Sequence, residues 1–147
     1  TCILFFMLNF NGLFVSLGRM GFHMSSHLSK NKQVDLYIYN RTEAIEKKCL
    51  TLFSGIKYHF EDDIKFDFII TCLKDDIAID LVTKKILQIG CFKKTTVFID
   101  HSTISLDQVK KNNNLKNISN LHLLDTTGHG GVEGAKKQSR SPMEEGK

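Results

Sequence analysis

The sequence has few cysteines, one proline and no internal repeat, and these shortages exclude several classes of protein. Its 4 cysteines include no Cys-x-x-Cys pair, which argues against a disulfide framework and favours free thiols in a reducing compartment. With 41% apolar and 24% charged residues, the composition is near the globular average, so collagen-like, coiled-coil and disordered classes are disfavoured. The net charge of +4 comes from scattered lysines, so we expect no nucleic-acid partner. The length of 147 residues predicts one domain.

Residues 1–11 form an apolar leader of unknown role. The leader lacks the basic region and the small-residue cleavage site of a signal peptide. Asn9, Asn11 and Gly12 interrupt it well short of the ~20 apolar residues of a membrane span, so we expect no membrane partner. A targeting segment, an extra strand and upstream sequence outside the domain all stay open. We expect a cytoplasmic protein, with a mitochondrial or other organellar location also open.

Short β-rich runs alternate with helical patterns from Gly12 onward, which predicts βαβ units and a parallel sheet. The expected fold is α/β and doubly wound, with a mostly parallel sheet in the order 3-2-1-4-5-6 over residues 12–137. We predict a helix from Ser105 that ends in the asparagines 112–114, and a polar, disordered or truncated tail over residues 138–147. The start at Thr1 and this tail indicate that both ends are cut. The expected strands are 13–15, 35–39, 56–58, 66–71, 95–100 and 121–124, and the other expected helices run to about residue 30, from 42 to before 55, and over 76–89.

The turn after the first predicted strand carries a defective dinucleotide-binding fingerprint. The full pattern has three glycines, for a tight turn, for close approach of pyrophosphate and for helix–strand packing. Gly18 and Gly21 fill the second and third places, and Ser16 holds the first. A serine fits this turn if its backbone angles are negative, although its Cβ crowds a cofactor. The alternative is a plain glycine turn before a core helix.

Asn40-Arg41-Thr42 follows the second predicted strand, where an NAD site usually has a carboxylate for the ribose hydroxyls. Without that carboxylate a 2′-phosphate is not repelled, and a guanidinium can bind it with two hydrogen bonds. The segment therefore favours NADP over NAD as cofactor. The alternative makes Arg41 a solvated turn residue and Thr42 only a helix cap.

Four segments together resemble the β-hydroxyacid dehydrogenases, the group of 3-hydroxyisobutyrate dehydrogenase and glyoxylate/succinic semialdehyde reductase. The resemblance covers about residues 12–137. 6-Phosphogluconate dehydrogenase shares several of these motifs but typically has Gly-Gly-Asn after the fifth strand, so Ser102-Thr103-Ile104-Ser105 favours the hydroxyacid branch. The segments are FVSLGRMGFHM (14–24), NRT (40–42), DHSTIS (100–105) and DTTGHGGVEGA (125–135).

The resemblance implies a Rossmann-type NADP-binding domain that serves hydride transfer between NADP(H) and a small hydroxyacid or its aldehyde or keto acid. Lys74 departs from the proline that the family usually has at that position. His129 stands in the family's serine position, beside the directly matching Gly130 and Gly131, and these three residues are the implied substrate-binding set. The implied cofactor-binding set is Ser16, Leu17, Gly18, Arg19, Met20, Gly21, Asn40, Arg41, Thr42, Leu73, Lys74 and Thr103.

No catalytic residue is assigned, because no lysine here matches the context of the family's catalytic lysine, which lies on a helix after the Rossmann domain. The resemblance also implies a homo-oligomer formed through that later helical domain. A non-catalytic dinucleotide-binding or interaction module, or an inactive fragment, remains the alternative function. His23 and His27 have no third ligand in sight, so we predict no metal site. Asp100, His101 and Ser102 are adjacent residues whose side chains point in different directions as the chain leaves a strand, so we predict no catalytic triad there.

Overall fold

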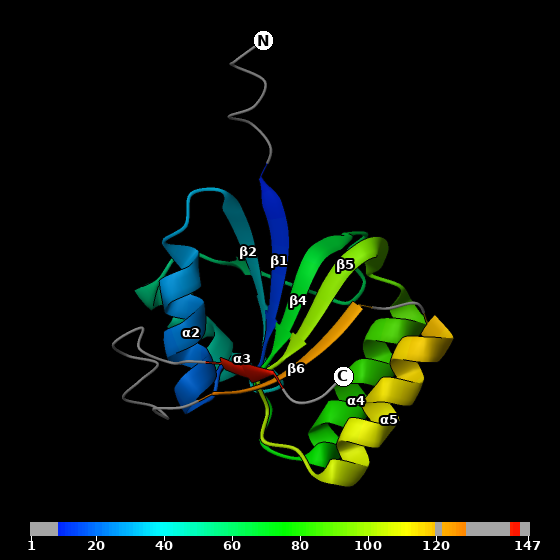
Figure 1. The fold of residues 1–147 in the computed structure, drawn as a ribbon. Coiled ribbons are helices and arrows are strands. Elements are labelled where there is room, and N and C mark those ends of the chain that lie inside the picture. The colour runs from blue at the N-terminus through cyan, green and yellow to red at the C-terminus, as the bar shows by residue number, and fades with distance from the viewer. Residues whose placement is uncertain (1–8, 120–121, 129–141, 145–147) are drawn as a thin grey trace.

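The computed structural model describes residues 9–119, 122–128 and 142–144 (Figure 1). Strands and helices alternate along most of them. In chain order the elements are β1 (Phe10–Val15), α2 (Arg19–Ser29), β2 (Val34–Tyr39), α3 (Glu43–Leu52), β3 (Ile56–Lys57), β4 (Phe66–Thr71), α4 (Asp76–Ile89), β5 (Phe92–Asp100), α5 (Leu106–Ser119), β6 (His122–Gly128) and β7 (Pro142–Glu144).

The strands form one sheet in the order β3-β2-β1-β4-β5-β6-β7. Strands β1 to β6 pair in parallel, which confirms the predicted doubly wound sheet with the order 3-2-1-4-5-6. β7 pairs antiparallel with β6, in the polar tail where the sequence pattern predicts no strand. The direction of winding reverses at β1, because β2 pairs with one of its edges and β4 with the other.

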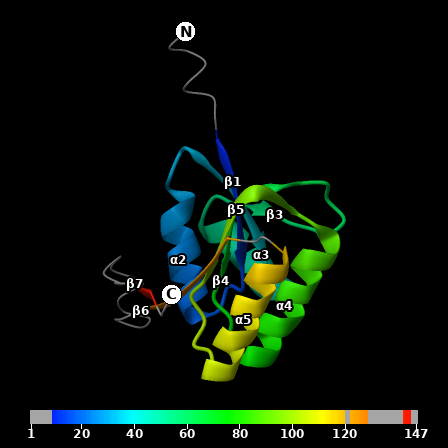
Figure 2. The ribbon, with the colours of Figure 1, turned by 45° about the vertical axis from the view of Figure 1, so that its right-hand side comes forward.

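Helices cover both faces of the sheet. Figures 1 and 2 show α2 and α3 on one face and α4 and α5 on the other. The side chains of β1 alternate between these layers: Leu13 and Val15 belong to the core under α4, with Ile86, and Phe14 belongs to the core under α2 and α3, with Cys49. Because the second half of β1 is buried on both faces, residues 13–15 form a continuous apolar run rather than an alternating one.

β1 begins earlier than the apolar run indicates. Phe10 and Asn11, assigned above to the leader, belong to this strand. The Phe10 N–H donates to the Gln33 carbonyl at 2.8 Å, and the Asn11 N–H donates to Asp67 Oδ2 at 2.8 Å. β5 likewise begins ahead of its predicted range. No helix within the described residues combines the length and apolarity that a membrane span requires.

Helix α5 does not end at Asn112–Asn114, and that prediction is wrong. Asn112 is buried, at 3% exposure, and its side-chain oxygen accepts a hydrogen bond within the helix from Gln108 Nε2 at 3.0 Å. Gln108 also donates to Asp80 of α4 at 2.8 Å. The burial of Asn112 and the contact of Gln108 with α4 outweigh the low helix propensity of asparagine, and α5 continues to Ser119.

Candidate functional site

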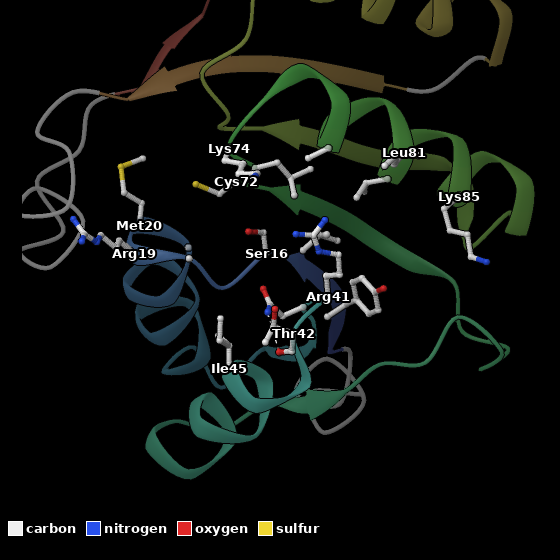
Figure 3. A pocket seen from close by; sticks show the side chains of 18 of the residues that line it. Ser16, Arg19, Met20, Arg41, Thr42, Ile45, Cys72, Lys74, Leu81 and Lys85 are labelled. Carbon is white, nitrogen blue, oxygen red and sulfur yellow. Dashed lines mark hydrogen bonds between the residues drawn. The ribbon is translucent and has the colours of Figure 1, made fainter.

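A pocket of about 680 Å³ lies at the carboxyl ends of β1, β2 and β4 (Figure 3). Its walls come from the turns that follow these three strands, together with one side of α4 and the segment after β3. It therefore spans the position where the strand order reverses. The lining residues are Val15, Ser16, Gly18, Arg19, Met20, Gly21, Tyr39, Asn40, Arg41, Thr42, Ile45, Phe60, Cys72, Leu73, Lys74, Ala78, Leu81, Val82 and Lys85.

The β1–α2 turn has the shape of the fingerprint, but its first position departs from the condition stated for a serine there. Ser16 has a φ of 79°, so it does not have the negative backbone angle with which a serine fits this turn. The turn holds it there: its N–H donates to the Tyr39 carbonyl at 2.9 Å, and its own carbonyl packs against Gly21, where a Cβ would collide with the carbonyl oxygen. Gly21 is thus required for helix–strand packing. A Cβ at Gly18 would meet nothing within 4 Å, so Gly18 borders open space.

The N-terminus of α2 adjoins this open space. Gly18 is its N-cap residue, no side chain makes a capping hydrogen bond, and the first turn carries no acidic residue. The partial positive charge of the helix end therefore stays uncompensated by side chains and attracts an anion such as a phosphate. Arg19, at the α2 end of the pocket in Figure 3, adds a full positive charge.

Asn40 connects the β1–α2 turn with the β2–α3 turn. Its Oδ1 accepts from the Leu17 N–H at 3.0 Å, and its Nδ2 donates to the Thr42 carbonyl at 3.0 Å. Leu17 is 3% exposed and does not line the pocket, so its part is to hold this link. Thr42 is the N-cap of α3 as predicted, but its hydroxyl makes no capping hydrogen bond. Arg41 lies between the two fixed residues, and Figure 3 shows it amid the pocket side chains.

The β4–α4 turn contributes Leu73 and Lys74 to the pocket lining. The Leu73 N–H donates to Ser102 Oγ at 2.7 Å, and the Ser102 N–H donates to Asp100 Oδ1 at 3.0 Å. Ser102 therefore fixes the backbone of this turn, and its hydroxyl is directed at Leu73. Thr103, its exposed neighbour, is not part of the pocket lining.

The charged side chains that line the pocket are all positive. Arg19, Arg41, Lys74 and Lys85 line it, and no aspartate or glutamate among the described residues does. Such a lining favours an anionic ligand with several charges.

Apolar side chains also line the pocket, and sequence reasoning missed them. Ile45, Phe60 and Leu81 line it. The Phe60 ring packs 4.7 Å from that of Tyr39, and Lys85 Nζ lies 5.5 Å from its centroid. The spacing of Ala78, Leu81, Val82 and Lys85 places them on one side of a helix, which was the available signal for the α4 wall. No motif marks Phe60.

The implied substrate residues His129, Gly130 and Gly131 lie outside the described residues. Within the described ranges, no group of three or more His, Cys, Asp or Glu side chains could hold a metal ion. The described cysteines, Cys49, Cys72 and Cys91, are free of disulfides.

The pocket lies where parallel strands end and the strand order reverses, next to a glycine turn and a helix N-terminus. This arrangement defines the class of dinucleotide-binding Rossmann domains. Within that class, the chain belongs to the family described as the NAD binding domain of 6-phosphogluconate dehydrogenase, whose model matches residues 13–147. It is accordingly an NAD(P)-binding domain of the oxidoreductase type.

Comparisons with individual proteins confirm the resemblance to hydroxyacid dehydrogenases. The mitochondrial 3-hydroxyisobutyrate dehydrogenase of Drosophila melanogaster is 29% identical over 134 residues, covering 88% of this chain and 40% of that protein. An uncharacterized oxidoreductase of Shewanella frigidimarina is 29% identical over 133 residues, covering 88% and 45%. The structure of Mycobacterium tuberculosis 3-hydroxyisobutyrate dehydrogenase with L-serine matches with a TM-score of 0.83 at 23% identity, covering 95% and 47%. The chain thus spans less than half the length of these proteins.

Proposed function

We propose that this domain binds NADP in preference to NAD. The observation that carries the proposal is the β2–α3 turn, where Arg41 lines the pocket between Asn40 and Thr42 and no carboxylate lines the pocket among the described residues. A guanidinium can hold a 2′-phosphate with two charge-assisted hydrogen bonds, whereas a carboxylate here would repel it. The pyrophosphate would lie at the α2 N-terminus, where Gly18 leaves the space open, and Leu73 and Lys74 would face the nicotinamide half.

Titration of the protein with NADPH and NADH, by fluorescence or calorimetry, tests this preference. Arg41→Ala should weaken NADPH binding by about 10- to 100-fold, which corresponds to the ~1.5–3 kcal/mol of a hydrogen bond to a charged group. NADH binding should change little. Lys47→Ala is the matched control, because Lys47 is an exposed cation on α3 that pairs with Glu43 at 3.3 Å and does not line the pocket. Equal affinities of the native protein for NADPH and NADH would refute the proposal.

We further propose hydride transfer between NADP(H) and a small hydroxyacid or its aldehyde or keto acid, with His129, Gly130 and Gly131 at the substrate and a homo-oligomer as the assembly. The similarity to 3-hydroxyisobutyrate dehydrogenases supports the reaction class. Turnover of 3-hydroxyisobutyrate, glyoxylate or succinic semialdehyde tests it. The departures at Ser16 and Lys74 favour the second candidate, a non-catalytic binding module. Intact cofactor binding without turnover would select that candidate.

A further inference from the structure

Glu46, in the first turn of α3, is a buried carboxylate outside the pocket lining. Its exposure is 2%. Its Oε2 accepts a hydrogen bond from the Asn40 N–H at 3.0 Å, and its Oε1 forms an ion pair with Lys57 Nζ of β3 at 3.3 Å. A buried carboxylate is costly unless it is paired and hydrogen-bonded, so these two contacts account for its tolerance.

The contacts of Glu46 lead directly to the turn that carries Arg41. Asn40 is held at three points: its backbone N–H by Glu46, its Oδ1 by the Leu17 N–H and its Nδ2 by the Thr42 carbonyl. The backbone is thereby fixed on both sides of Arg41. Through Leu17, the same network also reaches the β1–α2 turn.

Lys57 has a second carboxylate partner, which provides an internal comparison. Glu43 Oε1 lies 3.2 Å from Lys57 Nζ, yet the Glu43 side chain is 62% exposed and no hydrogen bond links it to Asn40. Hydrogen bonds to Glu43 and Glu46 raise the pKa of Lys57 above its ordinary value, so the ammonium stays charged at neutral pH. The two glutamates share a helix and a cation, and they differ in burial and in the link to the turn.

We propose that Glu46 and Lys57 are positioning residues that set the preference of the pocket for a 2′-phosphorylated dinucleotide. The inference rests on the NADP preference proposed above. When the turn is already ordered, Arg41 binds the phosphate without loss of backbone freedom. The affinity is then higher, because no free energy goes into ordering the turn on binding. Disruption of the pair frees the turn, and the ligand that depends on Arg41 then loses affinity while the unphosphorylated ligand loses little.

The test compares NADP⁺ and NAD⁺ dissociation constants in Glu46→Ala, Glu46→Gln and the control Glu43→Ala. Glu46→Ala should raise the NADP⁺ constant roughly 10-fold, as expected when a preordered side chain becomes mobile, and the NAD⁺ constant by less than about 3-fold. Glu46→Gln keeps an acceptor for the Asn40 N–H but loses the charge that faces Lys57, so its effect should be intermediate. Glu43→Ala should leave both constants within about 2-fold of the native values.

Thermal unfolding of each variant separates positioning from a general loss of stability. If Glu46→Ala lowers the melting temperature but leaves the ratio of the two constants unchanged, the pair is only structural and the inference is wrong. If Glu46→Ala does not fold, Glu46→Gln decides the question by the same ratio. A native protein that binds both ligands equally, or an Arg41→Ala variant with native selectivity, would overturn the proposed NADP preference and this inference with it. If the preference for NADP⁺ is lost in Arg41→Ala but kept in Glu46→Ala, this inference is overturned and the proposed NADP preference stands.

Discussion

Replacement of Ser16 by glycine is expected to stabilise the protein. Ser16 has a φ of 79°, a backbone region that residues with a Cβ rarely adopt and that glycine adopts freely. The turn leaves it no alternative, since its N–H is bound to the Tyr39 carbonyl and its carbonyl packs against Gly21. The strain is therefore built into the turn and disappears when the Cβ is removed.

The size of the effect follows from two opposing contributions. Relief of a positive φ at a residue with a Cβ is worth about 1–2 kcal/mol. Glycine makes the unfolded chain more flexible, which costs about 0.4–1 kcal/mol. The net gain of about 0.5–1 kcal/mol corresponds to a rise of about 2–4 °C in melting temperature for a domain of this size.

Thermal unfolding followed by circular dichroism measures this rise, with Ser16→Ala as the matched control. Alanine keeps the Cβ and removes only the hydroxyl, so it should bring no gain. A Ser16→Gly protein no more stable than Ser16→Ala would refute the assignment of strain to this backbone angle. Because Ser16 also lines the pocket, NADP⁺ affinity should rise in the glycine variant and stay near native in the alanine variant.

Three further predictions concern other parts of the molecule. Gly21→Ala should lower the free energy of unfolding by about 1–3 kcal/mol, measured with denaturant, because the new Cβ meets a backbone oxygen. Gly18→Ala should keep the free energy of unfolding within ~0.5 kcal/mol of the native value and weaken NADP⁺ binding in titration. Burial alone would raise the pKa of Asp67, but hydrogen bonds from Lys93 and the Asn11 N–H lower it below 3.8. The ionised carboxylate therefore stabilises the fold above pH 3.8, and this stabilisation is lost as the pH falls through the folded pKa. The melting temperatures of the native protein and Asp67→Asn should differ at about pH 5–8 and converge in acid. Burial raises the pKa of the Cys91 thiol, so iodoacetamide at pH 8, followed by peptide mass spectrometry, should label it far more slowly in the folded than in the urea-unfolded protein.

The strands were predictable because buried parallel strands are apolar runs, and their order because βαβ units of this kind form a doubly wound sheet. The range predicted for β4, Phe66–Thr71, agrees with the structure for this reason. The end of α5 was not predictable, because it depends on the burial of Asn112 and on the contact of Gln108 with Asp80 of α4, which no local pattern encodes. β7 was missed because its residues have no apolar alternation and pair only with β6.

The candidate site, too, was predictable where local motifs determine it and not where tertiary packing does. The positions of Gly18, Gly21 and Arg41 at the pocket follow from local motifs whose mechanism is known. Phe60 enters the pocket from the segment after β3 because of tertiary packing, so sequence spacing gives no sign of it. The contact of Glu46 with the Asn40 N–H depends on how the β2–α3 turn folds, so local motifs give no sign of it.

The central position of β1 has a consequence for folding during synthesis. β1 is made before both of its neighbours, and its contacts with them span very different lengths of chain. Asn11 pairs with Asp35 of β2 after 24 residues, whereas its N–H meets Asp67 of β4 only after 56. At translation rates of roughly 5–20 residues per second, one edge of β1 stays without its partner strand for roughly 3–10 seconds. During that interval its backbone groups and the apolar side chains meant for the α4 layer are exposed, which is the condition under which nascent chains aggregate or recruit chaperones. A ribosome-bound chain would complete the cofactor pocket only after α4 emerges.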